Sequence, residues 1–197
     1  MKPSLPYFEH KKGFYISPES LILIVLTVIV FITFYLEISL GFNLGNWAIY
    51  FAIIWVLYFF AFTFSNFFRY EREIGTYNGM IRFGENLISL NDKEYKLKEI
   101  EKISFSSTDV KGDSLLYLRG MSPSLSNGLN NSITLKLIDG TKVEATFLQT
   151  KTRRLKFYKE ILTYYYLENK FSWLHLLDVL EMNNYEEIQI FKKKIHS

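Results

Sequence analysis

Two long stretches without a charged side chain dominate the first third of this 197-residue chain. Residues 20–36 and residues 38–68 contain no Asp, Glu, Lys or Arg, and most of their side chains are aliphatic or aromatic. A helix needs about 20 mostly apolar residues to cross a bilayer core roughly 30 Å thick. A soluble domain of this size has too little interior to bury two such helices. The sequence therefore predicts a transmembrane helical hairpin over residues 18–70, with spans at about 20–40 and 47–68.

The first apolar stretch also follows basic residues, as the core of a secretory signal peptide does. It is longer than the roughly 7 to 15 residues of such a core, and no small-residue cleavage site follows it. A retained membrane span is therefore the preferred interpretation.

Basic residues flank the two spans, and the connection between the spans, residues 37–46, has none. The flanking cations are Lys2, Lys11, Lys12, Arg69, Arg72 and Arg82. Because Lys and Arg accumulate on the cytoplasmic side of a membrane, we expect a multi-pass protein of the inner (cytoplasmic) membrane with both termini in the cytoplasm. Residues 1–17 are then a cytoplasmic tail. The absence of cysteine fits a cytoplasmic domain that needs no disulfides.

After the second span the pattern changes to alternating polar and apolar residues separated by turn residues, which indicates strands. The dipeptide Asp139-Gly140 lies between two such segments and is a strong signal for a β-hairpin. Strands are predicted at residues 76–83, 87–90, 94–97, 101–107, 114–118, 132–137 and 142–147.

The last quarter of the chain has helical periodicity. An amphipathic helix is predicted over about residues 152–167, because its apolar side chains recur at helical spacing. Two more helices are predicted over residues 172–182 and 184–194. Asn184 is placed to cap the last one.

Three segments carry a resemblance to a known family: NGMIRFGENLISLND, YKLKEIEKISF and ITLKLIDGTKVEATF. Strands in this order, followed by an amphipathic helix, resemble the bacterial pleckstrin-homology-like (PH-like) domains that follow two transmembrane helices. The resemblance implies an α+β membrane protein with a PH-like antiparallel β-sandwich or barrel of about seven strands over residues 73–168. Residues 169–197, a helical pair, have no counterpart in it.

What the resemblance implies about function is a module for protein binding or self-association. Phosphoinositide-binding PH domains carry Lys and Arg around their first hairpin. Here that hairpin holds Gly84, Glu85 and Asn86, with only Arg82 nearby. Recognition of a phosphoinositide headgroup is therefore not supported.

The layout is also similar to the small effectors of cyclic-oligonucleotide antiphage signalling. Those proteins combine two membrane helices with a β-rich cytoplasmic domain, in which ligand binding drives membrane disruption. The similarity is in layout alone, and it implies a possible nucleotide ligand.

Catalytic and metal-binding patterns are weak. The histidines, His10, His175 and His196, are scattered, and His175 is interpreted as a packed or surface residue of a helix. Asp109 and Asp113 lack the further ligands of a calcium loop. No phosphate-binding glycine motif occurs. We therefore predict no catalytic residue, no cofactor and no metal.

DNA binding is also disfavoured. A net charge of +3 is small, and Glu186, Glu187 and Gln189 occupy the start of the last helix, where a DNA-reading helix would approach bases. The predicted partners are the lipid bilayer and a protein or a second copy of the chain.

The loop SPSLSNGLNN and the basic start of the first C-terminal helix are the best candidates for recognition. The loop is about 13 residues long, a length often tied to function; its polar side chains could donate to a phosphate or a partner backbone, and its glycine permits a positive φ. The alternatives are a plain connector and a solvated helix face. The candidate residues are Arg119, Ser124, Ser126, Asn127, Gly128, Asn130, Arg153 and Arg154.

Two functional hypotheses follow. The first is a non-enzymatic integral membrane protein whose cytoplasmic PH-like domain binds a protein partner or itself in a regulatory or scaffold role. The second is an effector of antiviral defence that binds a cyclic nucleotide and disrupts the membrane when it oligomerises.

Overall fold

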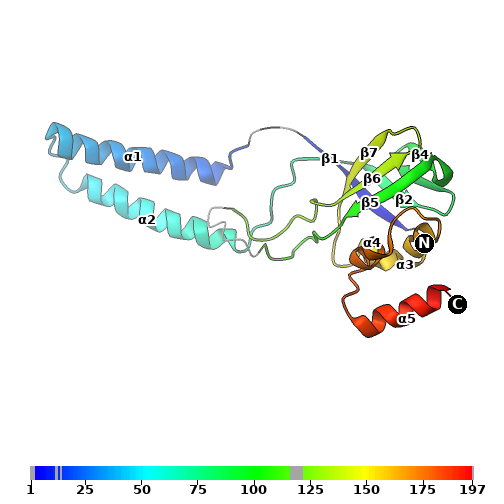
Figure 1. Cartoon of the computed structure of the whole chain (residues 1–197). Coiled ribbons are helices and arrows are strands. Elements are labelled where there is room, and N and C mark those ends of the chain that lie inside the picture. Colours follow the sequence, from blue (N-terminus) through cyan, green and yellow to red (C-terminus); the bar gives the residue numbers. More distant parts are fainter. Residues whose placement is uncertain (1–2, 12, 14, 116–121, 197) are drawn as a thin grey trace. The chain divides into compact units, whose positions relative to one another are not determined.

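The computed structural model describes residues 3–11, 13, 15–115 and 122–196 (Figure 1). The chain divides into two units. The hairpin unit consists of the described residues within Lys12–Glu71 and Leu116–Leu125. The sheet unit consists of the described residues within Met1–Lys11, Arg72–Leu115 and Ser126–Ser197.

The hairpin unit is built from two helices that lie side by side, α1 (Pro18–Leu40) and α2 (Trp47–Asn66) (Figure 1). The start of α1 is capped by Ser17, whose hydroxyl accepts a hydrogen bond from the Ser20 amide at 3.0 Å. Its end is set by Gly41, which adopts a left-handed φ of 68°. Both predicted spans are thus confirmed as helices, and both are long and apolar enough to cross a membrane.

A few polar contacts join the two helices. The Trp55 indole donates to the Thr27 hydroxyl at 2.7 Å, and the Tyr58 hydroxyl donates to the Glu19 carbonyl at 3.1 Å. Arg69 forms an ion pair with the Glu19 carboxylate. These contacts fix the pairing of the helices, because almost every other side chain that meets between them is apolar and non-directional.

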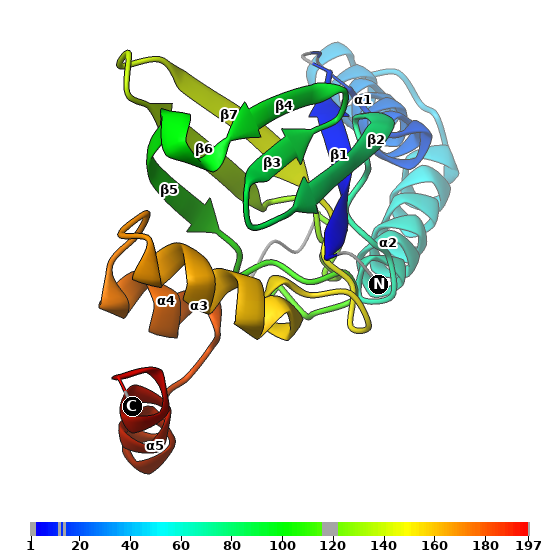
Figure 2. The same ribbon diagram turned by 90° about the vertical axis from the view of Figure 1, so that its right-hand side faces the viewer.

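The sheet unit contains one seven-stranded antiparallel sheet in the order β4-β3-β2-β1-β7-β6-β5 (Figure 2). Its strands are β1 (Ser4–His10), β2 (Gly75–Phe83), β3 (Leu87–Leu90), β4 (Lys93–Lys96), β5 (Ile100–Ser106), β6 (Ser132–Leu137) and β7 (Lys142–Phe147). The sheet is strongly curled, and β4 and β5 are its two ends.

Strand β1 lies in the middle of the sheet although it precedes the helical hairpin in the sequence. It pairs with β2 from Ser4↔Arg82 to His10↔Gly75, and with β7 at Tyr7↔Phe147. The Lys11 amide donates to the Ile74 carbonyl at 3.1 Å, one step beyond this ladder. The whole helical hairpin is therefore an insertion between two neighbouring strands.

Helices close one end of the curled sheet. In chain order they are η2 (Leu155–Tyr158), α3 (Lys159–Leu167), α4 (Trp173–Val179) and α5 (Tyr185–His196), whereas the short 3₁₀ turn η1 (Leu97–Glu99) connects β4 to β5. Tyr165 of α3 is fully buried, and its hydroxyl donates to the Gly84 carbonyl at 2.9 Å. Tyr158 donates to the Ser4 carbonyl at 2.7 Å. Figure 2 shows α3 and α4 at this end, with α5 beyond them.

The hydrophobic core lies between the curled sheet and these helices. Alternate residues of the strands point into it, as a half-buried strand requires. Its fully buried members include Leu5, Ile81, Ile88, Ile103, Ile133, Leu135, Phe147, Leu155, Leu162 and Leu176.

Several predictions about this unit are confirmed and others are wrong or incomplete. Strands β3, β6 and β7 have the predicted bounds. Strand β2 begins one residue earlier than predicted, and β4 and β5 each begin and end one residue earlier. The tail of residues 1–17 was not predicted to contain a strand, yet it supplies β1. The predicted strand at 114–118 is not found in its described part, where Ser114 makes only an isolated bridge; residues 116–118 lie outside the described residues.

Two further differences concern shape. The predicted sandwich or barrel is a single curled sheet that does not close. The helix predicted over 152–167 begins later and starts as the 3₁₀ turn η2, because residues 150–153 form a tight turn in which Thr150 and Arg153 exchange backbone hydrogen bonds.

Candidate functional site

The Ser, Asn and Gly loop divides between the two units. In the hairpin unit, the Ser124 amide donates to the Asn66 carbonyl at 2.9 Å, and the Leu125 amide donates to the Arg69 carbonyl at 3.0 Å. Asn66 is the last residue of α2, so its carbonyl is one that a helix leaves without an internal partner. Arg69 lies three residues beyond the helix. This half of the loop therefore binds the backbone at and just after the end of α2. From Ser126 onward the loop belongs to the sheet unit.

In the sheet unit the loop folds around the carboxylate of Asp109. One oxygen accepts from the Ser126 hydroxyl, and the other accepts from the Asn130 amide at 2.9 Å. The same Ser126 hydroxyl accepts from the Gly128 amide at 2.8 Å. Ser126 is fully buried, so its hydrogen bonds serve the fold.

Asn131 and Gln149 complete this polar cluster, and both are about 1% exposed. The Asn131 side-chain nitrogen donates to the carbonyls of Asp109 and Gly128, each at 2.8 Å. Its side-chain oxygen accepts from the Asp109 amide and from the Gln149 side chain, each at 3.0 Å. Gln149 in turn accepts from the Leu155 amide at 2.8 Å. Buried amides with all their partners specify one arrangement of the chain.

Gly128 is required at its position. Its φ is +75°, and a Cβ placed there would lie 2.4 Å from the Gln149 carbonyl oxygen and 2.6 Å from the Lys111 nitrogen. The predicted use of a glycine with positive φ is thus confirmed as backbone geometry. The atoms that leave no room for a side chain at Gly128 belong to the protein's own backbone.

The structure brings most of the candidate loop residues together but turns them inward. Ser126 and Asn127 are buried, and the Asn127 side chain bonds to the Arg72 carbonyl and the Leu129 amide. Asn130 is exposed. Arg119 lies outside the described residues. We name this internally bonded set, Asp109, Ser126, Asn127, Asn131 and Gln149, the polar cluster.

The basic run at the start of the C-terminal helices is partly neutralised. Arg154 and Lys156 both bind the carboxylate of Glu181, with the Lys156 ammonium 2.9 Å from it. Lys159 lies 3.9 Å above the ring of Phe191, a cation–π contact. Arg153 is exposed. Three of these cations, Arg154, Lys156 and Lys159, therefore contact residues after α4 or in α5.

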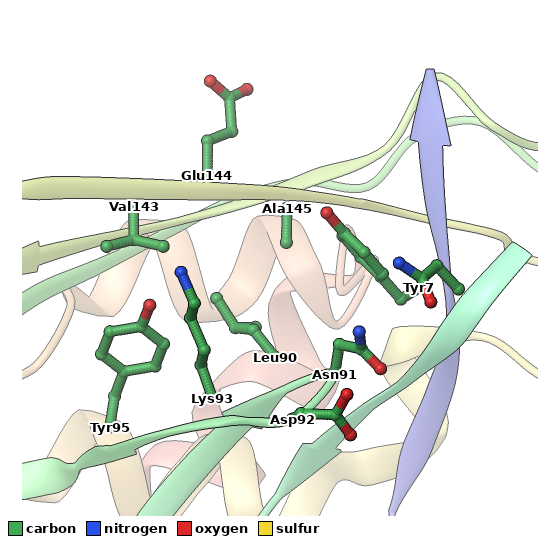
Figure 3. Close-up of a pocket in the computed structure, with 10 residues that line it drawn as sticks. Tyr7, Leu90, Asn91, Asp92, Lys93, Tyr95, Val143, Glu144 and Ala145 are labelled. Atoms are coloured by element: carbon green, nitrogen blue, oxygen red, sulfur yellow. The ribbon is translucent and has the colours of Figure 1, made fainter. Parts of the chain in front are cut away.

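A pocket of about 330 Å³ lies in the sheet unit, on the side of the sheet where strand β7 separates from β1 (Figure 3). The ladder between β1 and β7 covers only Phe147 and Thr146, so the first part of β7 leaves room beside it. The lining residues are Tyr7, Asn78, Leu90, Asn91, Asp92, Lys93, Tyr95, Val143, Glu144 and Ala145.

Sequence reasoning missed this pocket. Tyr7 lies in the unpredicted strand β1, so its place beside β7 could not be found without the register. One signal was present, because Lys93 and Tyr95 alternate along β4 and must share a face of the sheet.

His175 caps an edge of the sheet. Its Nε2 atom accepts a hydrogen bond from the Phe105 amide of the end strand β5 at 2.9 Å. Burial lowers the pKa of His175 below its ordinary value, and nearby Lys102 acts in the same direction, while Asp178 opposes the shift. The prediction that His175 is a packed or surface residue of a helix is confirmed, since it lies half-buried in α4. Its hydrogen bond to the sheet was not revealed by the sequence.

A small charged network lies beside the start of β2. Glu73 accepts from the Lys111 ammonium at 2.7 Å and from the Tyr77 hydroxyl at 3.0 Å. The lysine contact lowers the pKa of the Glu73 carboxyl, and burial together with Glu73 raises the pKa of Tyr77 to about 12. This network fixes the chain where it enters the sheet.

Within the described residues, no group of three or more His, Cys, Asp or Glu side chains is arranged to hold a metal ion. Comparison of the chain with protein families, with curated proteins and with solved structures finds no match. The function has to be argued from the chain's own geometry.

Proposed function

We propose that this chain is a non-enzymatic integral membrane protein whose hairpin unit spans the cytoplasmic membrane and whose sheet unit faces the cytoplasm. The sheet unit, a PH-like domain on this proposal, binds a protein partner or a second copy of the chain in a regulatory or scaffold role.

The exposed apolar surface of the hairpin unit carries the membrane part of the proposal. Phe31 is 71% exposed and Phe60 is 67% exposed, and such side chains surround both helices. Soluble monomers rarely expose apolar patches above a few hundred Å². Lipid accepts this surface, because each helix satisfies its own backbone hydrogen bonds.

The insertion of the hairpin between β1 and β2 supports the topology. His10 and Gly75 are paired in one ladder, so the chain enters and leaves the hairpin from adjacent positions in the sheet unit. If both helices cross the bilayer, the segments before and after them lie on one side. The flanking cations favour the cytoplasmic side.

The order of elements in the sheet unit supports the PH-like assignment. The chain runs through antiparallel strands β2 to β7 and then into α3, which closes one end of the sheet. Exposed apolar side chains support a docking role: Leu174 is 76% exposed, Ile138 is 69% exposed and Ile190 is 68% exposed. Large exposed apolar side chains of this kind are common at protein interfaces.

The chain's lack of cysteine provides a clean test of topology. Single substitutions Asn43→Cys, between the helices, and Lys142→Cys, in the sheet unit, would be labelled with a membrane-impermeant maleimide. We expect Asn43→Cys to react in intact cells, and Lys142→Cys to react only after lysis. The reverse pattern, or recovery of the chain in the soluble fraction, would reject the proposal.

Partner binding is tested on the full chain in lipid nanodiscs. Light scattering measures its oligomeric state, and crosslinking in membranes identifies neighbours. A monomer with no crosslinked protein at any concentration would reject the interaction role.

The pocket favours the second candidate, a ligand-gated membrane effector, because a sensor domain needs a ligand site. Calorimetry of the full chain in nanodiscs against cyclic nucleotides, with dye leakage from vesicles as the second readout, tests it. Absence of both heat and leakage across the panel would reject the effector function.

A further inference from the structure

Among the described residues that line the pocket, Lys93 directs a charged group into its interior. In Figure 3 the ammonium group of Lys93 points into the space beneath β7, between Tyr95 and Leu90. The carboxylate of Glu144 projects from the other side of β7, away from that space. Asp92 lies at the turn beside Asn91, on the side of the pocket toward β2. The electrostatic character of the interior is therefore set by Lys93.

Lys93 lies on the end strand β4 and its side chain is exposed. Among the contacts made by the described residues, its ammonium takes part in no ion pair or hydrogen bond. Lys96, on the same strand, lies 3.8 Å from Glu99. The Lys93 ammonium, on an exposed side chain, is therefore available to pair with an anion.

The walls around this cation are apolar and aromatic. Leu90 is 6% exposed and Ala145 is 4% exposed, and both belong to the hydrophobic core, against which Tyr7, Tyr95 and Val143 also pack. The pocket is thus lined in part by side chains of the hydrophobic core. Its volume of about 330 Å³ is at the lower limit of small-molecule sites, which measure roughly 300–1,000 Å³.

We propose that this pocket binds a small molecule with a single negative charge on a flat, aromatic body. The ring would lie against Leu90 and Tyr95, and the anion would pair with Lys93. Multiply charged ligands such as polyphosphates fit poorly, because Lys93 is the one cation among the described residues that line the pocket, and Asp92 is beside it. The inference needs only the sheet unit and stands apart from the membrane role.

Two sources share this chemistry, a free aromatic carboxylic acid and a cyclic mononucleotide, whose phosphodiester also carries one charge. The probes are indole-3-acetate, its uncharged twin indole-3-acetamide, and cyclic adenosine monophosphate. Binding is measured by calorimetry and by ligand-detected NMR on the full chain in nanodiscs. Empty nanodiscs correct for partition into lipid.

The matched variants are Lys93→Gln and Lys96→Gln. Both remove a positive charge from strand β4, but only Lys93 lines the pocket. Val143→Phe fills the space instead of removing the charge. Thermal melting of each variant shows whether it is folded, and both lysines are exposed, so their replacement leaves the core intact.

We expect saturable binding of one anion, at least about tenfold weaker in Lys93→Gln, since a charge-assisted hydrogen bond is lost. Lys96→Gln should change affinity less than about twofold. The amide should bind at least about tenfold more weakly than its acid, and Val143→Phe should abolish binding in a folded protein. Binding of the nucleotide alone would identify the phosphodiester as the source.

Three results would overturn the proposal: no saturation by either anion, equal affinity for the acid and its amide, or equal loss of affinity in the two lysine variants. If no probe binds and the labelling pattern shows the proposed membrane topology, this ligand site is rejected and the membrane proposal is unaffected.

Discussion

The two units use the same apolar side chains in opposite ways. Phe31 and Phe60 in the hairpin unit expose more than half of their surface, whereas Phe147 and Phe8 in the sheet unit expose 0% and 1%. The sheet unit buries most of its described phenylalanines behind strands and helices, although Phe157 is 55% exposed. In the hairpin unit the two helices pack against each other and leave many of the phenylalanines exposed. On the membrane proposal, lipid covers these exposed side chains.

Polar groups show the complementary contrast. In the described part of the hairpin unit, the Thr63 hydroxyl and the Asn66 side-chain nitrogen are buried without a hydrogen-bond partner. In the sheet unit, the buried amides of Asn131 and Gln149 are fully engaged, although the Arg154 Nε atom is buried without a hydrogen-bond partner. Directional bonds therefore specify the sheet unit, and the hairpin unit depends more on non-directional packing.

The largest effect should come from placing a carboxylate in each environment. Phe147→Asp puts a charge into the core and should destabilise the sheet unit by more than about 4 kcal/mol. Phe31→Asp should leave that unit folded but raise the cost of membrane insertion by roughly 2.5–3.5 kcal/mol. Limited proteolysis of the sheet unit and membrane fractionation separate the two outcomes. Equal protease sensitivity of the sheet unit in both variants would contradict the claim that the two units place their phenylalanines in different environments.

A smaller loss should follow when the polar cluster is interrupted. Asn131→Ala leaves several buried backbone groups without partners, at about 1–3 kcal/mol each, so a loss of at least about 3 kcal/mol is expected. Asn130→Ala keeps the backbone amide that bonds Asp109 and should cost much less. Chemical denaturation followed by tyrosine fluorescence measures both. Similar midpoints would show that the cluster does not stabilise the fold.

The two turn glycines offer a narrower comparison. Gly128→Ala combines a left-handed φ with a clash against backbone and should cost about 2–3 kcal/mol. Gly140→Ala has a similar φ of +87° but open space around it, so about 1 kcal/mol is expected. If the two variants have the same melting temperature, the Gln149 carbonyl does not lie this close to Gly128 in solution.

The smallest effect concerns acid stability. Because burial lowers the pKa of His175 in the folded chain, the unfolded chain takes up this proton first as the pH falls. The contribution of His175 is therefore complete above its ordinary pKa of 6.5 and is lost as the pH falls through the lower folded value. Protonation also removes the acceptor of the Phe105 amide.

His175→Gln keeps a hydrogen-bond acceptor that does not titrate near neutral pH. We expect this variant to show a shallower decline in melting temperature between about pH 6.5 and pH 5 than the parent chain. A decline of the same slope would assign the acid sensitivity to other groups.

The sequence allowed the prediction of every element whose signal is local. The uncharged stretches predict α1 and α2 through length and composition. Alternation and Asp139-Gly140 predict β6 and β7 with their observed bounds. Each of these patterns is formed by residues that are close in the sequence, so each element can be predicted from its own segment alone.

The central strand could not be predicted in this way. Residues 4–10, SLPYFEH, contain a proline and little alternation, and their partners lie in β2 and β7, far along the chain. Seven strands were predicted and seven are found in the described sheet, but β1 is one that the sequence did not reveal. Missing β1 also hid the pocket, because Tyr7 is one of its walls.

The loop of Ser, Asn and Gly shows a second limit. Its composition indicated either recognition or connection, and composition does not distinguish outward from inward donors. Only the pairing of Asn131 with Asp109 and Gln149 shows that these side chains fill the interior.

One measurement tests the central claim that the sheet unit folds around β1 and that the hairpin is an insertion into it. Residues 1–11 would be joined to residues 74–197 by a two-residue Asn-Gly turn, because the Lys11 amide already bonds the Ile74 carbonyl. We expect this shortened chain to be soluble and to melt cooperatively, while residues 73–197 without β1 should aggregate. A joined chain that aggregates, or a chain without β1 that melts just as cooperatively, would contradict the account.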